Sequence, residues 1–598
     1  MKKLVSLVLC LALAFSLVAC SSAPKKDVAA GTGVQIRILG QSVNEAIMNI
    51  MRDQLTKAGF DVKLDTQPDY SSYKSAVAAG AYDLAVTGWT TVTGNPDYAT
   101  RDIFITGGAY NTQPLSDPKV DELINKAAAE TPAQYVATYT ELENYLVTEQ
   151  AYIVPLYSSL RIQAINNKVL DVKTVRQPKS RSGVWEAYSY MDKALNATRP
   201  LVMTQTNGTL TSLDPIQAND GSVNALSSNM NIRLVNLTDE DEVTAVGSLS
   251  RNYSIAEGND VYYFLLRDDV NFAKIQDKKA ADSGVRVGAE DVKFTLDRAK
   301  DKTSVAVHKT YTLHEHMKTV EILTDLNELN TVKDSDTGKP VLETLVAGVE
   351  SPVKALTADK TKANNAKGTY QVIKITTTEP FPQVLNYLAH QSAGILNKEQ
   401  VTAYNSKFDV AKYDATKDVC YGDFNAIKSG NNMLYTSGPY TLVSVDDISA
   451  EFQKNPGYMK GTEFEPKIEK ISIKFIKDNT SAVSAFRAGE IDLLGNVPTT
   501  DVATVEANKD FTVQKRSSNG VSYAAFNLSE GSICADQDVR LAVLNAINQE
   551  DFIKYNSGLV NPAYSTVSTI IETGNVHKQD LAKSAEHVAA YQAKAAKK

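Results

Sequence analysis

Two matching phrases in distant parts of this 598-residue chain constrain its fold more than any other feature. SAVAAGAYDL, residues 75–84, and SAFRAGEIDL, residues 484–493, share Ser, Ala, Ala-Gly and Asp-Leu at equal offsets. Each phrase follows a predicted strand, residues 62–64 in the first case and 470–475 in the second, and each contains a helix that ends at Gly. Such strand–helix–strand units predict an α/β fold, and their repetition predicts two similar lobes that can close on a ligand.

The residues before the first phrase add another predicted strand and helix to this α/β pattern. A strand is predicted over residues 34–39, and Ser42 with Glu45 three residues later forms a capping box for the next helix. Gly59 ends that helix. Its apolar face is formed by Val43, Ala46, Ile47, Ile50, Met51 and Leu55.

The strand within residues 81–90 ends at Gly88-Trp89. In an open α/β sheet the ligand crevice lies beyond the carboxyl ends of the strands. An indole at this position either covers a ligand or caps the core, and position alone leaves both interpretations open.

Length and composition exclude several classes of protein. A chain of this length needs more than one core. Its 43% hydrophobic and 22% charged residues are typical of a folded protein. The formal net charge of -8 and the lack of a dense Lys/Arg block argue against a nucleic-acid partner.

The N-terminus predicts the compartment. Lys2 and Lys3 precede an apolar run, residues 4–18, that is built like a secretory signal. The run ends in Leu17-Val18-Ala19-Cys20, which resembles a bacterial lipobox, so we expect cleavage before Cys20 and lipid on its thiol. An ordinary signal with a chance Cys is the alternative. The polar residues that follow are a tether, and the body is expected at the outer face of the membrane.

No catalytic motif is present in the sequence. G-x-S-x-G, G-x-x-x-x-G-K-[ST], C-x-x-C and H-E-x-x-H are all missing. Ser116-Asp-Pro-Lys119 matches S-x-x-K in form, but a Ser or Asp cap followed by Pro begins a helix. We therefore predict a binding protein that is not an enzyme and holds no cofactor.

Histidine and cysteine indicate no metal site. His308, His314 and His316 are clustered, but their spacing favours solvent-exposed side chains over metal ligands. Cys420 and Cys534 leave open either a disulfide or two free thiols.

Six segments of the sequence resemble motifs of one known protein family. They are SLDP (212–215), VYYFLLRDDVNF (261–272), VRVGAEDVKFTLDRA (285–299), TSGPYTL (436–442), FRAGEIDLL (486–494) and DVRLAVLNAIN (538–548). Together they resemble family 5 of the extracytoplasmic solute-binding proteins, the oligopeptide/dipeptide/nickel-binding lipoproteins of ABC importers. The resemblance implies a two-lobed, type II periplasmic-binding-protein-like α/β fold with an extra subdomain. It also implies a monomer that captures a peptide or similar small solute and delivers it to an ABC permease.

The order of these segments is rotated, which implies a circularly permuted chain. In the family the LDP segment lies near the mature N-terminus and the Gly-Trp strand near the C-terminus, whereas here their order is reversed. Residues 330–367 are expected to be an insertion loop. The implied divisions are a signal peptide (1–19), a lipidated tether (20–33), a second lobe (34–154 and 528–598), a first lobe (155–235 and 430–527) and the extra subdomain (236–429).

The resemblance also implies the ligand-binding residues. A peptide would pair with the backbone of the Gly-Trp strand. The matching positions are Gly88, Trp89, Thr90 and Thr91 in that strand, Asn219, Asp220, Gly221 and Ser222 opposite it, and, more weakly, Asn527 and Tyr523, for which a core role is equally open.

One of these positions departs from the family. Many members place an Asp three residues after this Trp, where it binds the free ammonium of a peptide, and Val92 stands there in this chain. The sequence therefore predicts a ligand without a free N-terminal amine, unless Asp97 or Asp220 replaces that carboxylate. A signalling or adhesion lipoprotein that binds a partner protein on the same scaffold is the alternative function.

Overall fold

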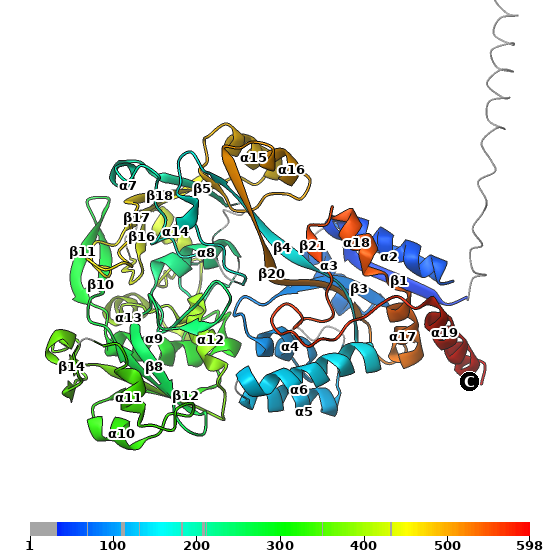
Figure 1. Cartoon of the computed structure of the whole chain (residues 1–598), viewed down its shortest axis with the longest axis horizontal. Helices are drawn as coiled ribbons and strands as arrows, with labels where there is room; N and C mark the ends of the chain where they lie inside the picture. Colours follow the sequence, from blue (N-terminus) through cyan, green and yellow to red (C-terminus); the bar gives the residue numbers. More distant parts are fainter. Residues whose placement is uncertain are drawn as a thin grey trace, which may run out of the picture. The chain divides into compact units, whose positions relative to one another are not determined.

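The computed structural model describes residues 33–597 except 69, 109–113, 131, 181–182, 206–209, 211, 220, 350 and 431–432. The predicted signal peptide and the lipid site at Cys20 lie outside the described residues. The chain divides into two compact units (Figure 1). Among the described residues, unit 1 comprises 33–86, 525–548 and 578–597, and unit 2 comprises 87–524 and 549–577. The predicted lobe boundaries are drawn differently from this division and stay predictions.

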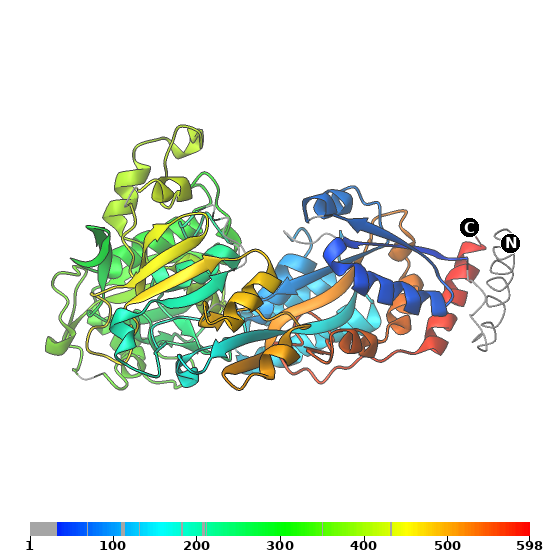
Figure 2. The same cartoon turned by 90° about the horizontal axis from the view of Figure 1, so that it is seen from above.

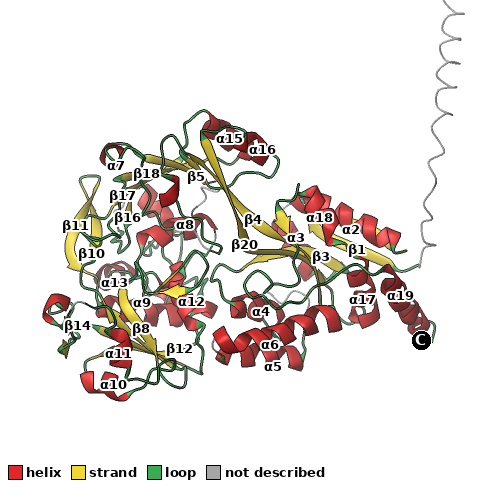
Figure 3. Cartoon of the chain, in the orientation of Figure 1, coloured by secondary structure: helices red, strands yellow, loops and turns green. Residues whose placement is uncertain are grey.

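Unit 1 is built on parallel strands with helices beside them (Figure 3). β1 (Gln35–Gln41) pairs in parallel with β2 (Asp61–Gln67) and, at Leu84 and Ala85, with β3 (Leu84–Thr90). α2 (Glu45–Lys57) connects β1 to β2, and α3 (Tyr70–Ala78) connects β2 to β3. Two further helices, which pack against each other, are α17 (Gln537–Ala546) and α19 (Leu581–Ala595).

The predicted capping box of α2 is wrong. Ser42–Asn44 form a separate 3-10 turn, and α2 begins only at Glu45. The Ser42 hydroxyl donates to the carbonyl oxygen of Pro68, and Val43 is 81% exposed instead of lying on the buried face. The predicted end of the helix is confirmed, because Gly59 adopts a φ of 95° that favours glycine.

The main sheet of unit 2 has the strand order β16-β17-β18-β5-β19-β4-β20-β3, with β21 paired to β4. β18, β5 and β19 are parallel, and β16 and β17 join them as an antiparallel pair. The strands are β16 (Tyr440–Val445), β17 (Ser449–Lys454), β18 (Lys470–Phe475), β5 (Leu201–Gln205), β19 (Leu493–Leu494), β4 (Ile153–Asn166), β20 (Phe511–Phe526) and β21 (Val560–Asn561).

The two matching phrases occupy equivalent places. α15 (Asn479–Arg487) connects β18 to β19, and β5 lies between these two strands. In the same way α3 connects β2 to β3, and β1 lies between them. The prediction of two equivalent parallel strand–helix–strand units is therefore confirmed.

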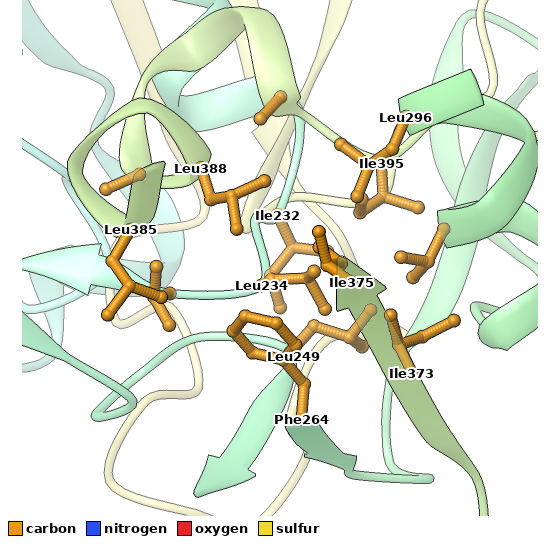
Figure 4. Close-up of a cluster of buried hydrophobic side chains, with 14 of the residues drawn as sticks. Ile232, Leu234, Leu249, Phe264, Leu296, Ile373, Ile375, Leu385, Leu388 and Ile395 are labelled. Atoms are coloured by element: carbon orange, nitrogen blue, oxygen red, sulfur yellow. The ribbon is translucent and has the colours of Figure 1, made fainter. Parts of the chain in front are cut away.

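A separate four-stranded sheet has the order β12-β15-β9-β8. Its strands are β12 (Met317–Leu323), β15 (Val372–Thr377), β9 (Val261–Leu266) and β8 (Ser250–Ile255), and α9 (Ala289–Lys300) packs on β12 and β15. Figure 4 shows Phe264 of β9 and Ile373 and Ile375 of β15 in one apolar cluster with Ile232 and Leu234. This cluster fixes the segment that carries Ile232 and Leu234 to the sheet.

The segment predicted as an insertion loop, residues 330–367, carries regular structure instead. It contains α11 (Val341–Leu345) and β13 (Ala355–Leu356). Val341 and Leu345, four residues apart on α11, are buried against Tyr263 and Leu265 of β9. Val332, Leu342, Val349, Val353 and Leu356 of the same segment also pack against this cluster, so scattered apolar side chains hold this polar segment on the sheet.

Short elements complete unit 2. The remaining α-helices are α4 (Pro96–Phe104), α5 (Pro118–Ala129), α6 (Pro132–Asn144), α7 (Leu195–Thr198), α8 (Gly221–Met230), α10 (Leu326–Thr331), α12 (Val384–Ala389), α13 (Lys398–Asn405), α14 (Phe424–Lys428), α16 (Val502–Glu506) and α18 (Gln549–Tyr555). The remaining strands are β6 (Asn236–Leu237), β7 (Val243–Thr244), β10 (Asn271–Gln276), β11 (Lys279–Arg286) and β14 (Thr369–Tyr370). Within the described ranges, no helix is long and apolar enough to cross a membrane.

Two features bear on the predicted permutation. The start of β1 and helix α19 lie at the same end of unit 1 in both views (Figures 1 and 2). In unit 2, only Arg199 and Pro200 separate α7 (Leu195–Thr198) from β5 (Leu201–Gln205). A permutation would have joined the former N- and C-termini near this point, and no long linker lies between these two elements. The permuted order itself stays a prediction.

Candidate ligand site

A cavity of about 620 Å³ lies within unit 2 at the carboxyl end of β3. Its size falls within the range of small-molecule sites. The lining residues come from β3, α4, β4, α8, α12, β20 and the loops beside them, and they are mainly polar. They are Trp89, Thr90, Val92, Tyr98, Ser159, Leu160, Arg161, Ile162, Lys179, Ser180, Asn219, Asn224, Ser228, Arg233, Ala389, His390, Gln391, Gly495, Asn496, Ser518 and Gly520.

Trp89 forms part of the cavity wall. The indole is half-buried, and its ring centroid lies 5.1 Å from that of Tyr98, which also lines the cavity. Tyr98 in turn meets Tyr387 edge-on, with centroids 6.4 Å apart. This row of rings holds Trp89 from one side and leaves an aromatic surface toward the cavity.

Four predicted positions share this wall, namely Trp89, Thr90, Val92 and Asn219. Gly88 and Thr91 of the same segment do not line it. A Cβ at Gly88 would stand 3.2 Å from the carbonyl oxygen of Val521, so glycine allows β20 to approach β3 closely. Thr91 is buried, and its backbone N–H donates to the carbonyl oxygen of Asn519 at 3.2 Å.

The remaining predicted positions are placed elsewhere or fall outside the description. Tyr523 is buried in β20 and does not line the cavity. Asn527 belongs to unit 1, where its amide donates to the carbonyl oxygens of Gly80 and Tyr82. Asp220 lies outside the described residues, and Gly221 and Ser222 begin α8, whose Asn224 and Ser228 do line the cavity.

The charged side chains on the wall are Arg161, Lys179 and Arg233. No Asp or Glu lines the cavity in the part of the chain that the structure describes. Sequence reasoning missed Arg161 and Arg233, together with the neighbouring His390 and Gln391. The one available signal was Arg233 itself, an arginine within the apolar run Ile232–Val235.

The clustered histidines are not solvent-exposed, so that expectation is wrong. The His314 ring is buried, with Nε2 2.8 Å from Ser392 Oγ, and the His316 ring stacks on Phe381 at 4.2 Å. His308 is half-buried, with Nε2 2.8 Å from the carbonyl oxygen of Ala299. Each ring has a packing role. Over the described ranges, no group of three or more His, Cys, Asp or Glu could hold a metal ion.

Cys420 and Cys534 are both free and buried. Burial raises the pKa of the Cys534 thiol well above its usual value, which makes it an unreactive thiol at neutral pH.

Comparison with known proteins assigns the family. Residues 244–598 match a sequence model described as bacterial extracellular solute-binding proteins, family 5 Middle. The glutathione-binding protein GsiB of Escherichia coli (strain K12) is 22% identical over 378 residues, which cover 63% of this chain and 58% of GsiB. The chain therefore spans less than two thirds of the length of this curated relative.

Solved structures are similar over comparable lengths. DppA from Helicobacter pylori in complex with the peptide STSA has 18% identity and a TM-score of 0.42, with 66% of each chain covered. MoaA from A. tumefaciens R10 in complex with mannopinic acid has 20% identity and a TM-score of 0.42, covering 66% of this chain and 65% of MoaA.

The family match covers more than half of the chain, and it agrees with the mixed α/β architecture. The predicted fold class, a type II periplasmic-binding-protein-like α/β fold, is confirmed. The family consists of binding proteins rather than enzymes. This chain belongs to the bacterial extracellular solute-binding proteins of family 5.

Proposed function

We propose that this protein captures a small peptide-like solute in the cavity of unit 2 and delivers it to an ABC importer. The observation that carries the proposal is the cavity of about 620 Å³ at the carboxyl end of β3, with Trp89 on its wall. Family membership supports solute capture outside the cytoplasm. The relative GsiB is a glutathione-binding protein, which supports a small solute.

The polar wall suits a solute that contains amide groups. Asn224 and Gln391 line the cavity, and carboxamide side chains can both donate hydrogen bonds to a bound amide and accept them from it. Trp89 and Tyr98 add an aromatic surface for an apolar side chain, and backbone pairing at β3 would bind a peptide regardless of its sequence.

Intrinsic fluorescence tests solute capture directly, because the chain has two tryptophans. Trp89 lies on the cavity wall, whereas Trp185 is buried in a core against Tyr440 and Phe452. Titration with a library of short peptides should change the emission of the wild type and of Trp185→Phe, but not of Trp89→Phe. A peptide-dependent change that survives in Trp89→Phe would contradict binding in this cavity.

We further propose that lipid on Cys20 anchors the protein at the outer face of the membrane. Expressed in a bacterium that processes lipoproteins, the wild type should appear in the membrane fraction and Cys20→Ser in the soluble extracytoplasmic fraction. Equal distribution of the two proteins would refute the anchor. Solute binding by purified Cys20→Ser should be unchanged.

The predicted lobes should close on the bound solute, since the closed form alone contacts it from both sides. Small-angle scattering should therefore show a smaller radius of gyration once a binding peptide has been identified and added in excess. An unchanged radius would contradict capture by closure without contradicting binding.

A further inference from the structure

We propose that unit 2 has a second ligand site, which takes an amphiphilic anion: a molecule with an acidic head and an apolar tail. The site is a cavity of about 620 Å³, called the hairpin cavity because the hairpin β10–β11 forms part of its wall together with α14, β16 and β17. These elements contact one another (Figure 1). The wall includes Ile275, Lys278, Ile427, Val443, Gln453 and Lys470.

The hairpin cavity is separate from the cavity of the proposed function, which is called the solute cavity below. The two walls have no residue in common. The inference therefore goes beyond the proposed function and does not depend on it.

Two lysines on the wall of the hairpin cavity lack a counter-charge. Lys278 and Lys470 form no ion pair and no side-chain hydrogen bond with any described residue. Lys428, the third lysine of the wall, is already paired with Asp447. Within the described ranges, Glu451 is the one carboxylate on this wall. Two unpaired ammonium groups against one carboxylate leave the wall net positive.

The contacts of Gln453 bring both lysines to the same end of the cavity. Lys470 lies opposite Gln453 in the antiparallel pair β17–β18, so the two side chains lie on one face of the sheet. Gln453 Oε1 accepts from the backbone N–H of Ala280 at 3.0 Å. Lys278 precedes Ala280 by two residues, in the turn of the hairpin. Long side chains at these two positions can bind one acidic head.

Gln453 adds an oriented N–H donor to the two ammonium groups. Because Oε1 accepts the Ala280 N–H, the hydrogen-bond network fixes which end of the amide is the nitrogen. This Nε2 forms no hydrogen bond with a described residue, and the side chain is only half-buried. Two ammonium groups and an amide nitrogen form a donor set that suits a carboxylate or a phosphate.

Lys278 adopts a backbone conformation that favours glycine. Gln276 and Lys279 are paired across the hairpin, and the two turn residues between them, Asp277 and Lys278, have φ angles of 51° and 58°. Such a two-residue turn favours Asn-Gly. Lysine at the second position therefore adds backbone strain that glycine would avoid. We take this outlier as support for a role of the ammonium group.

The apolar part of the wall suits a hydrocarbon tail. Ile275 of β10, Ile427 of α14 and Val443 of β16 line the cavity and are half-buried. Val443 is the extra residue of a bulge, because the register with β17 shifts between Leu442 and Ser444. A tail that covers these side chains would remove apolar surface from water.

Head and tail together define the class of ligand. A small polar anion would leave the apolar side chains in contact with water, and a neutral hydrocarbon would leave both ammonium groups unpaired. The cavity volume falls within the range of small-molecule sites. The ligand is thus an acyl or alkyl chain that ends in a carboxylate or a phosphate.

Calorimetry with matched ligands tests this class. Decanoate has both the head and the tail, 1-decanol has the tail without the charge, and butyrate has the charge with little tail. Decanoate should bind, and each of the other two should bind more weakly by about tenfold or more, which corresponds to about 1.4 kcal/mol. Decanoate that fails to bind, or that binds no more tightly than 1-decanol, would overturn the inference.

Variants of the two lysines test the donor set. Lys470→Gln and Lys278→Gly should each weaken decanoate binding by about tenfold. Lys278→Gly also relieves the left-handed strain, so it should unfold at a higher temperature than the wild type, and its lost affinity cannot come from misfolding. The control Lys412→Gln removes an exposed lysine outside the cavity and should keep the wild-type affinity. Equal affinity in all three variants would contradict the site.

A spin-labelled ligand locates the site. Trp185 packs against Phe452, a residue of the hairpin-cavity wall, with ring centroids 5.4 Å apart, whereas Trp89 lines the solute cavity. Decanoate that carries a nitroxide on its tail should quench Trp185 in Trp89→Phe more strongly than it quenches Trp89 in Trp185→Phe. The reverse order would assign the ligand to the solute cavity and overturn the inference, while leaving the proposed function intact.

Vesicles distinguish a free amphiphile from a membrane lipid, which offers the same chemistry. Cys20→Ser, which cannot carry lipid on a thiol at residue 20, is sedimented with vesicles of phosphatidylglycerol or of phosphatidylcholine. Sedimentation with phosphatidylglycerol alone, lost on adding Lys278→Gly, would identify a membrane lipid as the source. Decanoate binding without sedimentation would identify a free amphiphile, and absence of both would overturn the inference.

Discussion

Arg101 neutralises Asp97: its Nε lies 3.0 Å from each carboxylate oxygen of Asp97, one helical turn away on α4. Asp97 is fully buried and accepts a third bond from the Tyr387 hydroxyl at 3.1 Å. It does not line the cavity, whereas Val92 does. The carboxylate that could have replaced the missing family Asp is thus already used within the protein.

The first prediction follows from this pair. Because Val92 offers no acceptor and Asp97 is occupied, a free amino group on the solute gains no counter-charge here. Calorimetric titration of matched free and N-acetylated peptides should give similar affinities. Binding of the free form tighter by about tenfold, or about 1.4 kcal/mol, would show that an ammonium site exists. Loss of that preference in Asp220→Asn would then assign the site to Asp220.

A second prediction concerns the stability of the LDP segment. Arg298 of α9 donates to both oxygens of Asp214, and their side chains are 7% and 0% exposed. Removing one partner leaves the other charge buried and alone, which costs about 3 to 5 kcal/mol. Asp214→Asn should therefore unfold at clearly lower urea concentration than the wild type.

The control for that experiment is an exposed ion pair. Lys412 and Asp409 lie 3.3 Å apart with side chains 83% and 54% exposed. Lys412→Ala should shift the unfolding midpoint little, because exposed pairs contribute about 1 kcal/mol or less. Similar midpoints for Asp214→Asn and Lys412→Ala would contradict the structural role of the buried pair.

A third prediction concerns pH. Burial, helped by Asp97 and Glu315, raises the pKa of Asp102 from 3.8 to about 6. Below pH 3.8 the carboxyl is protonated in both states, and on raising the pH it ionises first in the unfolded chain. Its contribution therefore lowers the stability of the fold progressively between pH 3.8 and about 6, and this loss persists above pH 6.

Asp102→Asn removes this titration. Relative to the wild type, the variant should gain stability as the pH rises from 3.8 to about 6, and its advantage should be constant above that range. Chemical unfolding of both proteins over a pH series measures the difference. The exposed Glu463→Gln serves as the control, and a pH-independent difference for Asp102→Asn would refute the argument.

The repeated units were predictable because their signals are local. Apolar periodicity and a terminal glycine specify each strand and helix, and β18 occupies the predicted residues 470–475. The prediction of the capping box was wrong because a contact between distant residues decided the outcome. Ser42 and Glu45 have the spacing of a capping box, but the Ser42 hydroxyl donates to the carbonyl oxygen of Pro68, and the helix begins only at Glu45. Composition also misled at residues 330–367, where Val341 and Leu345, together with partly buried apolar side chains of the same segment, pack a polar segment against β9.

The solute cavity was predictable only in part. Trp89 and Thr90 end β3, and Val92 follows it. The position of the strand end suggested Trp89, and the family resemblance suggested Thr90 and Val92. Arg233 and His390 belong to no motif and come together only in the folded chain, because burial beside the apolar cluster brings two distant segments to one wall. No pattern in the sequence around Arg233 could indicate that His390 lies near it, and no pattern around His390 could indicate Arg233.

The last prediction tests the permuted order of the chain. If this order arose by joining old ends near residue 195 and reopening the chain in unit 1, the older order should still fold. The start of β1 and α19 lie at one end of unit 1, and Met191 in the proposed junction is 58% exposed. A variant with Lys597 joined to Gly33 by a short Gly/Ser linker, and opened between Asp192 and Lys193, should keep the solute affinity of the wild type. A control opened between Ile162 and Gln163, inside the buried part of β4, should lose both the fold and binding. Fluorescence titration through Trp89 measures binding and circular dichroism measures folding; loss of binding in the first variant, with its secondary structure gone, would count against the permutation.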